Sequence, residues 1–291
     1  MKEMVNVFWF RRDLRIEDNA GLYHALQNGK PVIPLFIFDS NILEKLDNKA
    51  DRRVAFIHDA ITHLQESLTK VGSSMFCFHG KPAVIWEQIT KKFEVENVFT
   101  NHDYEPYALE RDADVKELLE KKNIAFHTYK DQVIFEKQEV VKDDGKPYTV
   151  FTPYSRKWKS LLSDDNLKAY PIKKYATHFY QCKAQKIPSL KEMGFIENDQ
   201  PFPSQKADQA IIQHYAENRD FPGIRGTSKL GVHLRFGTIS IRQLASNALA
   251  NSPVFLNELI WRDFYHMILW NFPQVGKGAA FKPAYEHIAW R

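Results

Sequence analysis

The sequence predicts an α/β protein in which a doubly wound, parallel, five-stranded sheet of the Rossmann type precedes a long connector and the beginning of an all-α domain. Five short apolar runs rich in β-forming residues alternate with helical patterns over residues 1–130. Because these runs are continuously apolar, they fit strands that helices cover on both faces of a parallel sheet. From about residue 201 the patterns are helical. The expected domains are therefore 1–130 and 201–291, with 131–200 as the connector.

The elements of the first domain alternate in a regular order. Asp18-Asn19 can cap the first helix, which runs to Gln27, and each later helix is bounded by the neighbouring apolar runs. Strands are expected at 5–10, 31–38, 74–78, 97–100 and 124–129, and the later helices at 50–70, 82–93 and 105–122.

The carboxyl edge of this sheet is the expected place for a ligand. The turn after the first strand reads Arg11-Arg-Asp-Leu-Arg15, so the glycine pattern of a dinucleotide-binding turn is absent there. We expect this Arg cluster, Asp39 and residues 101–105 to line one edge. The alternative for each of them taken singly is ordinary loop polarity, which is the more common reading.

Composition describes a globular chain with no membrane span. Hydrophobic residues make up 44% of the 291 positions, and no apolar run reaches the roughly 18 residues that a span needs. Cys77 and Cys182 are the only cysteines, so we expect a reduced, cytoplasmic setting and no metal site. Residues 131–291 carry 22 Lys and Arg against 16 Asp and Glu, which suits a polyanion-binding surface.

The connector is rich in proline and weakly periodic, but one part of it is strongly aromatic. Tyr148-Thr-Val-Phe-Thr-Pro-Tyr154, followed by Trp158, is predicted to pack across both domains. Three helices should follow the connector, at 205–218, at 227–235 with Gly237 as its stop, and from the Ser240 cap to Ala250.

Gly226-Thr-Ser-Lys-Leu-Gly231 is a candidate phosphate site. Thr227 and Ser228 place hydroxyls and free N–H groups at an expected helix start, where the dipole favours anions. Gly226 lets the backbone come close to a ligand, and Lys229 adds charge. Plain helix capping by Thr227 or Ser228 is the alternative and, in isolation, the more frequent one.

The stretch Phe255-Leu-Asn-Glu-Leu-Ile-Trp-Arg-Asp-Phe-Tyr-His266 reads as an uninterrupted helix capped by Asn257. Glu258, Trp261, Arg262 and Tyr265 recur at i, i+3, i+4 and i+7, so all four should project from one face. The alternative is an exposed ion pair beside an exposed Trp.

These motifs together resemble those of DNA photolyases and cryptochromes, and the resemblance runs along nearly the whole chain. It is closest to the class I photolyases that repair cyclobutane pyrimidine dimers. The matching stretches are Trp9-Phe-Arg-Arg-Asp-Leu-Arg-Ile-Glu-Asp-Asn19, Tyr148–Tyr154, Arg219-Asp-Phe-Pro222, Thr227–Gly231 and Asn257–Tyr265. The resemblance implies an FAD-binding helical domain and a DNA repair lyase, in which excited reduced flavin donates an electron to a dimer flipped out of DNA.

The resemblance also implies roles for individual residues. Glu258 and Trp290 would be catalytic, Trp290 as the outermost tryptophan of an electron relay. Trp261 would stack on the flipped dimer and Arg219 would contact a phosphate. The implied FAD-binding residues are Tyr215, Thr227, Ser228, Lys229, Leu230, Gly231, Phe255 and Arg262. The implied DNA-binding residues are Arg219, Glu258, Leu259, Ile260, Trp261, Arg262, Asp263, Phe264 and Tyr265.

Glu258 favours repair of cyclobutane dimers, because its carboxylate can accept the N3–H of a flipped thymine. A blue-light photoreceptor of the cryptochrome type, without repair activity, is the main alternative, and a light-independent flavoprotein is a more distant one. We expect a monomer whose partner is DNA containing pyrimidine dimers.

Two departures from the family pattern carry expectations of their own. The chain stops well short of the usual length, so it resembles an N-terminal fragment that is inactive alone and lacks part of the FAD pocket. An antenna chromophore of the folate or deazaflavin type is expected but unassigned. Where folate-binding members have an acidic residue, this chain has Tyr107-Ala108.

Overall fold

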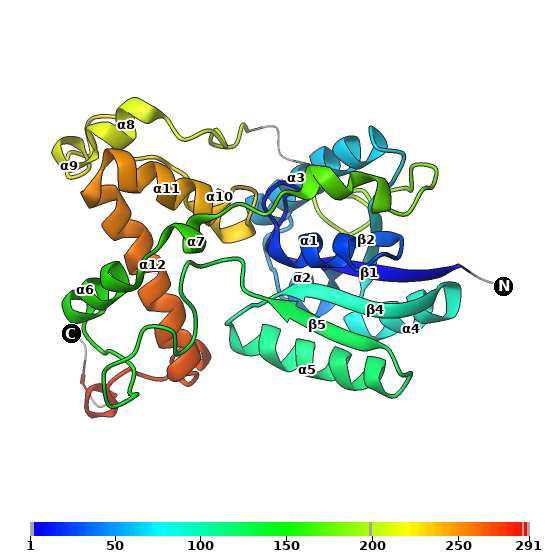
Figure 1. The fold of residues 1–291 in the computed structure, drawn as a ribbon, viewed down its shortest axis with the longest axis horizontal. Coiled ribbons are helices and arrows are strands. Elements are labelled where there is room, and N and C mark those ends of the chain that lie inside the picture. Colours follow the sequence, from blue (N-terminus) through cyan, green and yellow to red (C-terminus); the bar gives the residue numbers. More distant parts are fainter. Residues whose placement is uncertain (1–2, 198–199, 287, 290–291) are drawn as a thin grey trace.

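The computed structural model describes residues 3–197, 200–286 and 288–289, arranged as an α/β half and a helical half side by side (Figure 1). The sheet contains β1 (Met4–Phe10), β2 (Val32–Asp39), β3 (Phe76–Gly80), β4 (Glu94–Asn101) and β5 (Ala125–Tyr129). All its pairings are parallel, and the strand order is β3-β2-β1-β4-β5. The predicted doubly wound parallel sheet is confirmed.

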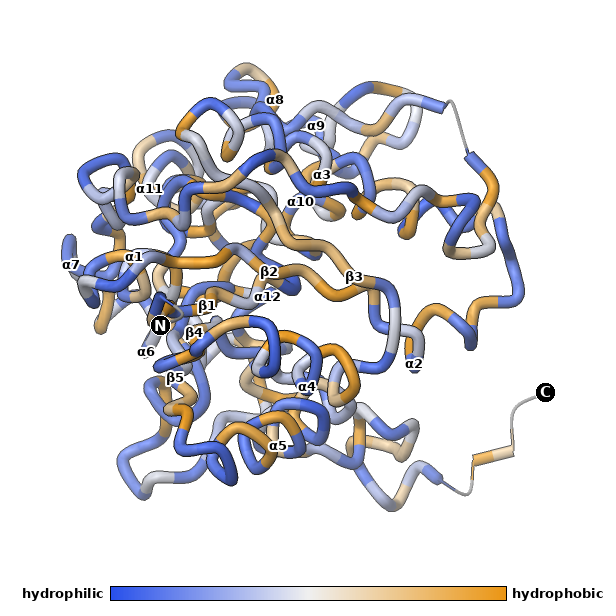
Figure 2. Tube along the Cα trace, turned by 90° about the vertical axis from the view of Figure 1, so that its right-hand side faces the viewer, coloured by the Kyte–Doolittle hydropathy of each residue, from blue (hydrophilic) through white to orange (hydrophobic). Residues whose placement is uncertain are grey.

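Helices cover both faces of the sheet, which explains why the central strands β1 and β2 are apolar along most of their length (Figure 2). One face packs against α1 (Ala20–Gln27) and α3 (Arg52–Thr69). The other face packs against α4 (Pro82–Lys92) and α5 (Pro106–Glu120). A single turn of helix, α2 (Ser40–Leu43), follows β2 directly.

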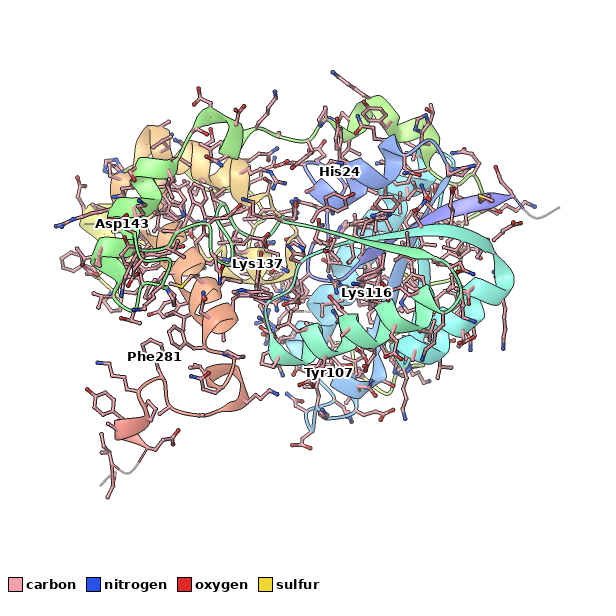
Figure 3. All side chains as sticks on the ribbon, turned by 60° about the horizontal axis from the view of Figure 1, so that its bottom comes forward. His24, Tyr107, Lys116, Lys137, Asp143 and Phe281 are labelled. Carbon is pink, nitrogen blue, oxygen red and sulfur yellow. The ribbon has the colours of Figure 1, made fainter. Side chains whose placement is uncertain are left out.

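The connector has more secondary structure than its sequence indicates. Its first part packs on the helical half and its later part on the α/β half. It contains α6 (Phe151–Leu161), α7 (Asp164–Leu167) and the 3-10 helix η1 (Ile172–His178). In Figure 3 Asp143, from its first part, lies over the helical half, where it pairs with Lys157 at 3.5 Å. Its later part wraps the α/β half, where the Tyr180 N–H donates to the Val32 carbonyl at 2.8 Å.

The aromatic segment of the connector does not pack across both halves as predicted. Tyr148, Phe151, Tyr154 and Trp158 all belong to the hydrophobic cluster of the helical half. The reason is that α6 lies along α12 (Pro253–Asn271), and the two helices bury these rings between them (Figure 1).

The helical half consists of short helices packed around α12. Its predicted first helix, 205–218, is in fact two pieces that meet at His214 and begin only after the Asp208 cap. The elements are α8 (Gln209–Gln213), α9 (Tyr215–Asn218), α10 (Gly231–Phe236), α11 (Ile241–Asn251), α12 and the 3-10 turns η2 (Val275–Lys277) and η3 (Pro283–Tyr285). None of the helices over the described ranges is long and apolar enough to cross a bilayer.

Candidate cofactor and nucleic-acid site

Helix α12, which carries most of the predicted site, begins earlier than the sequence suggested. Its cap is Ser252, whose Oγ accepts a hydrogen bond from the Phe255 N–H at 3.3 Å, and Pro253 occupies the first helical position. Proline is pre-organised for that position, so Ser252-Pro253 is the stronger start. The prediction that Asn257 is the cap is therefore wrong, because Asn257 lies inside the helix.

One side of α12 faces the interior. Leu259, Ile260, Asp263 and Phe264 are between 0 and 6% exposed. These four were predicted to contact DNA, and their burial removes them from any accessible surface in this structure. Leu259, Ile260 and Phe264 anchor the helix in the hydrophobic cluster of the helical half.

Asp263 ties α12 to the connector. Its Oδ2 accepts hydrogen bonds from the Ile134 N–H at 3.1 Å, the Phe135 N–H at 3.2 Å and the Trp158 Nε1–H at 3.0 Å. Burial raises the pKa of this carboxyl to about 6, because the three donors offset only part of the lost hydration. The connector and α12 are thereby held in one fixed arrangement.

The opposite side of α12 presents an aromatic surface. The Trp261 ring stacks on the Phe151 ring with centroids 3.6 Å apart and an interplanar angle of 5°. Tyr265, one turn further along the helix, stacks on Trp261 at 5.5 Å and is 58% exposed. We call Phe151, Trp261 and Tyr265 the aromatic stack. Rings at such a surface suit unpaired nucleobases.

Arg262 is half-buried like Glu258 and Trp261, but its guanidinium turns toward backbone carbonyls. Its guanidinium donates to the Gln132 carbonyl and, at 3.2 Å, to the Leu234 carbonyl. Burial lowers the pKa of Arg262 to about 10, and burial together with this cation lowers the pKa of neighbouring His266 to about 3. The Arg262 guanidinium therefore joins the connector to α10.

Arg219 and Glu258 form an ion pair beside the aromatic stack. Their side chains are 34% and 38% exposed, so both remain accessible to a partner. The Arg219 guanidinium also lies 5.9 Å from the Tyr215 ring centroid, and Tyr215 meets Phe255 edge-on at 5.0 Å. Arg219, the predicted phosphate contact, is thus paired with Glu258, the predicted lesion contact. Two predicted flavin contacts, Tyr215 and Phe255, lie next to this pair.

The candidate phosphate loop precedes its helix instead of starting it. Helix α10 begins at Gly231, and Lys229 in the loop has a left-handed backbone with φ of 53°. Within the part of the chain that the structure describes, the backbone N–H groups of Thr227, Ser228 and Lys229 donate no hydrogen bond. Three successive free N–H groups beside a lysine make a suitable cradle for an anion.

Gly226 has a different role from the one predicted. A Cβ at this position would lie 2.2 Å from the Asn218 carbonyl oxygen, so the close approach is to the protein's own backbone. A Cβ at Gly231 would meet no atom of the described residues within 4 Å, which leaves room beside the loop. Leu230, by contrast, is buried in the same hydrophobic cluster as Phe255 and Tyr215, and this contact brings the loop near the flavin residues.

The polar side chains at the carboxyl edge of the sheet form ion pairs and hydrogen bonds with other side chains of the protein. Arg12 pairs with Asp103 at 3.1 Å and with Glu105 at 2.9 Å. Burial would raise the pKa of Asp103, yet Arg12 and its neighbouring arginines hold it at about 2. Asp39 accepts the Tyr107 hydroxyl hydrogen bond at 2.6 Å. Ordinary loop polarity, the alternative for these residues, accounts for them here.

A buried cluster of four charges lies where the two halves meet. Asp131 accepts from Arg15 at 2.7 Å and from Arg242 at 2.8 Å, and Arg242 also donates to Asp18 at 2.9 Å. All four side chains are at most 8% exposed. Sequence reasoning missed this cluster, which we call the charge latch. Its only sequence signal is the charge density of the stretch from Arg11 to Asp18.

Trp290, predicted to be catalytic, lies outside the described residues. The remaining predicted positions converge on the helical half, where an anion loop, the Tyr215–Phe255 wall and the aromatic stack surround the Arg219–Glu258 pair. An α/β half with such a helical half has the features of a two-domain protein that holds a nucleotide cofactor beside a platform for bases.

Comparison with known proteins gives the family. The family model described as DNA photolyase matches residues 6–172. The deoxyribodipyrimidine photo-lyase of Halobacterium salinarum is 32% identical over 320 residues, which cover 99% of this chain and 66% of that protein. The chain belongs to the DNA photolyase family.

Two solved structures share the fold. The bacterial class III photolyase from Agrobacterium tumefaciens superposes with a TM-score of 0.82 at 22% identity, over 100% of this chain and 64% of that one. The archaeal photolyase from Sulfolobus tokodaii, solved with two FAD molecules, gives 0.72 at 24% identity, over 99% and 64%. The chain thus spans about two thirds of the length of these proteins.

Proposed function

We propose that the function of this protein is the light-driven repair of cyclobutane pyrimidine dimers, as a deoxyribodipyrimidine photo-lyase that uses FAD; that the 291-residue chain is inactive alone stays a prediction. The observation that carries the proposal is the accessible side of α12. It presents Trp261 and Tyr265 as a stacking surface for bases, with Glu258 and Arg219 beside it. Family membership and the FAD molecules of the archaeal relative support the choice of cofactor.

The residues around the anion loop fit FAD. The free N–H groups of Thr227, Ser228 and Lys229 would receive the pyrophosphate, with Leu230 and Gly231 completing the loop. Tyr215 and Phe255 would face the flavin ring system. Arg262, whose guanidinium bonds two backbone carbonyls, would act by holding α10 and its loop in place. When bound, reduced FAD supplies the electron that splits the dimer after it absorbs light.

DNA binding requires a change of partners at the Arg219–Glu258 pair. A phosphate would take Arg219, and the carboxylate released from it could accept the N3–H of a flipped thymine. Arg219, rather than Arg262, is the cation that pairs with Glu258. Binding of the backbone and recognition of the lesion are coupled through this exchange.

Trp261→Ala tests the proposal in this chain. We expect the parent chain to bind an oligonucleotide with one thymine dimer more tightly than the same sequence undamaged. The variant should lose roughly tenfold or more of the affinity for the damaged strand, because base–aromatic stacking contributes about 1–3 kcal/mol per base. Trp270→Ala is the matched control, since Trp270 lies on the same helix under Lys137 and outside the aromatic stack.

A second measurement addresses the light reaction. The chain is titrated with FAD, reduced and illuminated with bound dimer DNA, and dimer loss is followed with time. FAD binding without any preference for dimers would instead indicate the photoreceptor alternative. Equal affinity for damaged and undamaged DNA in the parent chain would contradict the repair proposal. The antenna chromophore, the monomeric state and the cytoplasmic location stay predictions.

A further inference from the structure

Phe151 reaches the proposed DNA site from the connector. It is the first residue of α6, and the rest of that helix is fixed against α12 by two buried rings, Tyr154 and Trp158. The Trp158 Nε1–H donates to Asp263 of α12 at 3.0 Å, so the register between the two helices is set by a buried hydrogen bond. The start of α6 is thereby held opposite Trp261.

The Phe151 and Trp261 rings are in close, nearly parallel contact. Their centroids are 3.6 Å apart, and the planes differ by 5°. Phe264 meets both rings edge-on, at 6.0 Å from Phe151 and 5.7 Å from Trp261. One face of the indole is therefore covered by Phe151, and Phe264 limits its rotation.

We propose that Phe151 is a positioning residue for lesion binding: it fixes the plane of Trp261, so that the aromatic stack presents a pre-set surface to a flipped base. This inference rests on the proposed function, and it adds the connector to the elements that build the site. A platform already fixed before binding does not lose rotamer freedom when the base arrives, so more of the stacking energy appears as affinity.

The inference predicts a loss of discrimination rather than a general loss of DNA binding. Phe151 is uncharged, so it contributes nothing to the counterion term that governs affinity for undamaged DNA. Rotation of the indole affects the affinity only of a ligand that stacks on Trp261. The ratio of the dissociation constants for undamaged and dimer-containing oligonucleotides isolates this effect.

Three variants of the 291-residue chain test the inference. Phe151→Leu removes the ring, Phe151→Tyr keeps it, and Val150→Ala removes a neighbouring exposed side chain that lies outside the aromatic stack. We expect Phe151→Leu to lower the discrimination ratio roughly 3- to 10-fold, as the energy of an aromatic pair implies. Phe151→Tyr and Val150→Ala should match the parent, and the salt dependence should not change in any variant.

Near-UV circular dichroism supplies a readout of the indole environment, which should change in Phe151→Leu and be restored in Phe151→Tyr. If Phe151→Leu lowers the melting temperature, Phe151→Met, which keeps more of the apolar volume, is measured as well. An unchanged ratio in a folded ring-less variant overturns the inference. A parent chain that shows no preference for dimers overturns the proposed function instead, so the two failures are distinguishable.

Discussion

Asp263 is a residue whose sequence position suggested one role and whose environment gives it another. The family resemblance placed it among the DNA contacts, but it is a buried acceptor for three N–H groups of the connector. Its second oxygen, Oδ1, has no hydrogen-bond partner among the described residues. A carboxylate in such a place stabilises the fold through its hydrogen bonds and destabilises it through its charge.

This balance predicts a pH dependence of stability. The folded pKa of Asp263 is about 6, above the ordinary value of 3.8, so the folded state holds the proton more tightly. The stability that it contributes is full below pH 3.8 and is lost as the pH rises through about 6. Asp263→Asn, which cannot ionise, should remove this fall. Its free energy of unfolding relative to the parent should therefore rise across that range, by up to about 3 kcal/mol.

Urea unfolding of parent and variant at several pH values measures the difference. Asp114→Asn, at an exposed position on α5, is the control and should run parallel to the parent. Asp263→Ala should be less stable than the parent by roughly 2–4 kcal/mol, since it leaves three buried donors without an acceptor. A parallel pH profile for Asp263→Asn would show that the carboxyl does not titrate in this window.

Arg219 carries a prediction about electrostatics. If it contacts a phosphate, Arg219→Ala should weaken binding of damaged and undamaged DNA alike. The slope of log affinity against log salt should become shallower by about one contact. Arg53→Ala is the control, because Arg53 is an exposed arginine of α3 that pairs with Asp51. An unchanged slope in a salt titration would remove Arg219 from the interface.

At the scale of elements, the sequence was most informative where burial is two-sided. Each strand of the sheet could be predicted from the sequence. A strand that is covered on both faces shows as an apolar run, whichever strands lie beside it. Gly237 was correctly predicted as a stop. It has φ of 65°, and a Cβ there would lie 2.2 Å from the Arg12 carbonyl oxygen.

The errors fell where short-range signals compete. Asn257 and Ser252 are both good caps, and Pro253 decides between them only through its place in the first turn. The i, i+3, i+4, i+7 spacing put Arg262 on the open face, but a long side chain can turn inward to backbone carbonyls that no local pattern reveals. The Phe151–Trp261 contact joins residues 110 positions apart, and only the aromatic content of its segment hinted at it.

The two glycines that flank the anion loop make a matched pair. Gly226→Ala should displace the loop, because its Cβ would lie 2.2 Å from the Asn218 carbonyl oxygen. We expect weaker FAD binding and a lower melting temperature for that variant. Gly231→Ala has open space around its Cβ and should leave stability within about 0.5 kcal/mol of the parent. Calorimetric titration with FAD and thermal unfolding measure both, and equal behaviour of the two would contradict the assignment.

At the scale of the molecule, the charge latch sets how the halves meet. Arg15 and Asp18 come from the α/β half, Asp131 opens the connector, and Arg242 comes from α11. Around it, the Leu14 N–H donates to the Phe236 carbonyl at 3.0 Å. The loop that follows β1, at the edge where open α/β sheets bind ligands, is bonded here to α10 of the helical half.

Arg242→Met tests the latch. Removing one cation leaves Asp18 and Asp131 buried with too little positive charge, so we expect a loss of roughly 3–5 kcal/mol in the free energy of unfolding. Urea unfolding followed by Trp fluorescence and by far-UV circular dichroism measures it. Arg156→Met, on the exposed side of α6, is the control and should match the parent. A variant as stable as the parent would mean that water enters the latch.

The charge latch also affects whether the α/β half can fold as an isolated domain. The natural cut follows β5 at residue 130, yet Asp131 is the next residue, and its carboxylate neutralises Arg15 inside the other piece. A polypeptide of residues 1–130 would keep every strand, but in it Arg15 would lose Asp131 and Asp18 would lose Arg242. A longer piece that includes Asp131 would still lack Arg242. Independent folding of the α/β half therefore depends on one side chain of the helical half, Arg242, which pairs with both Asp18 and Asp131.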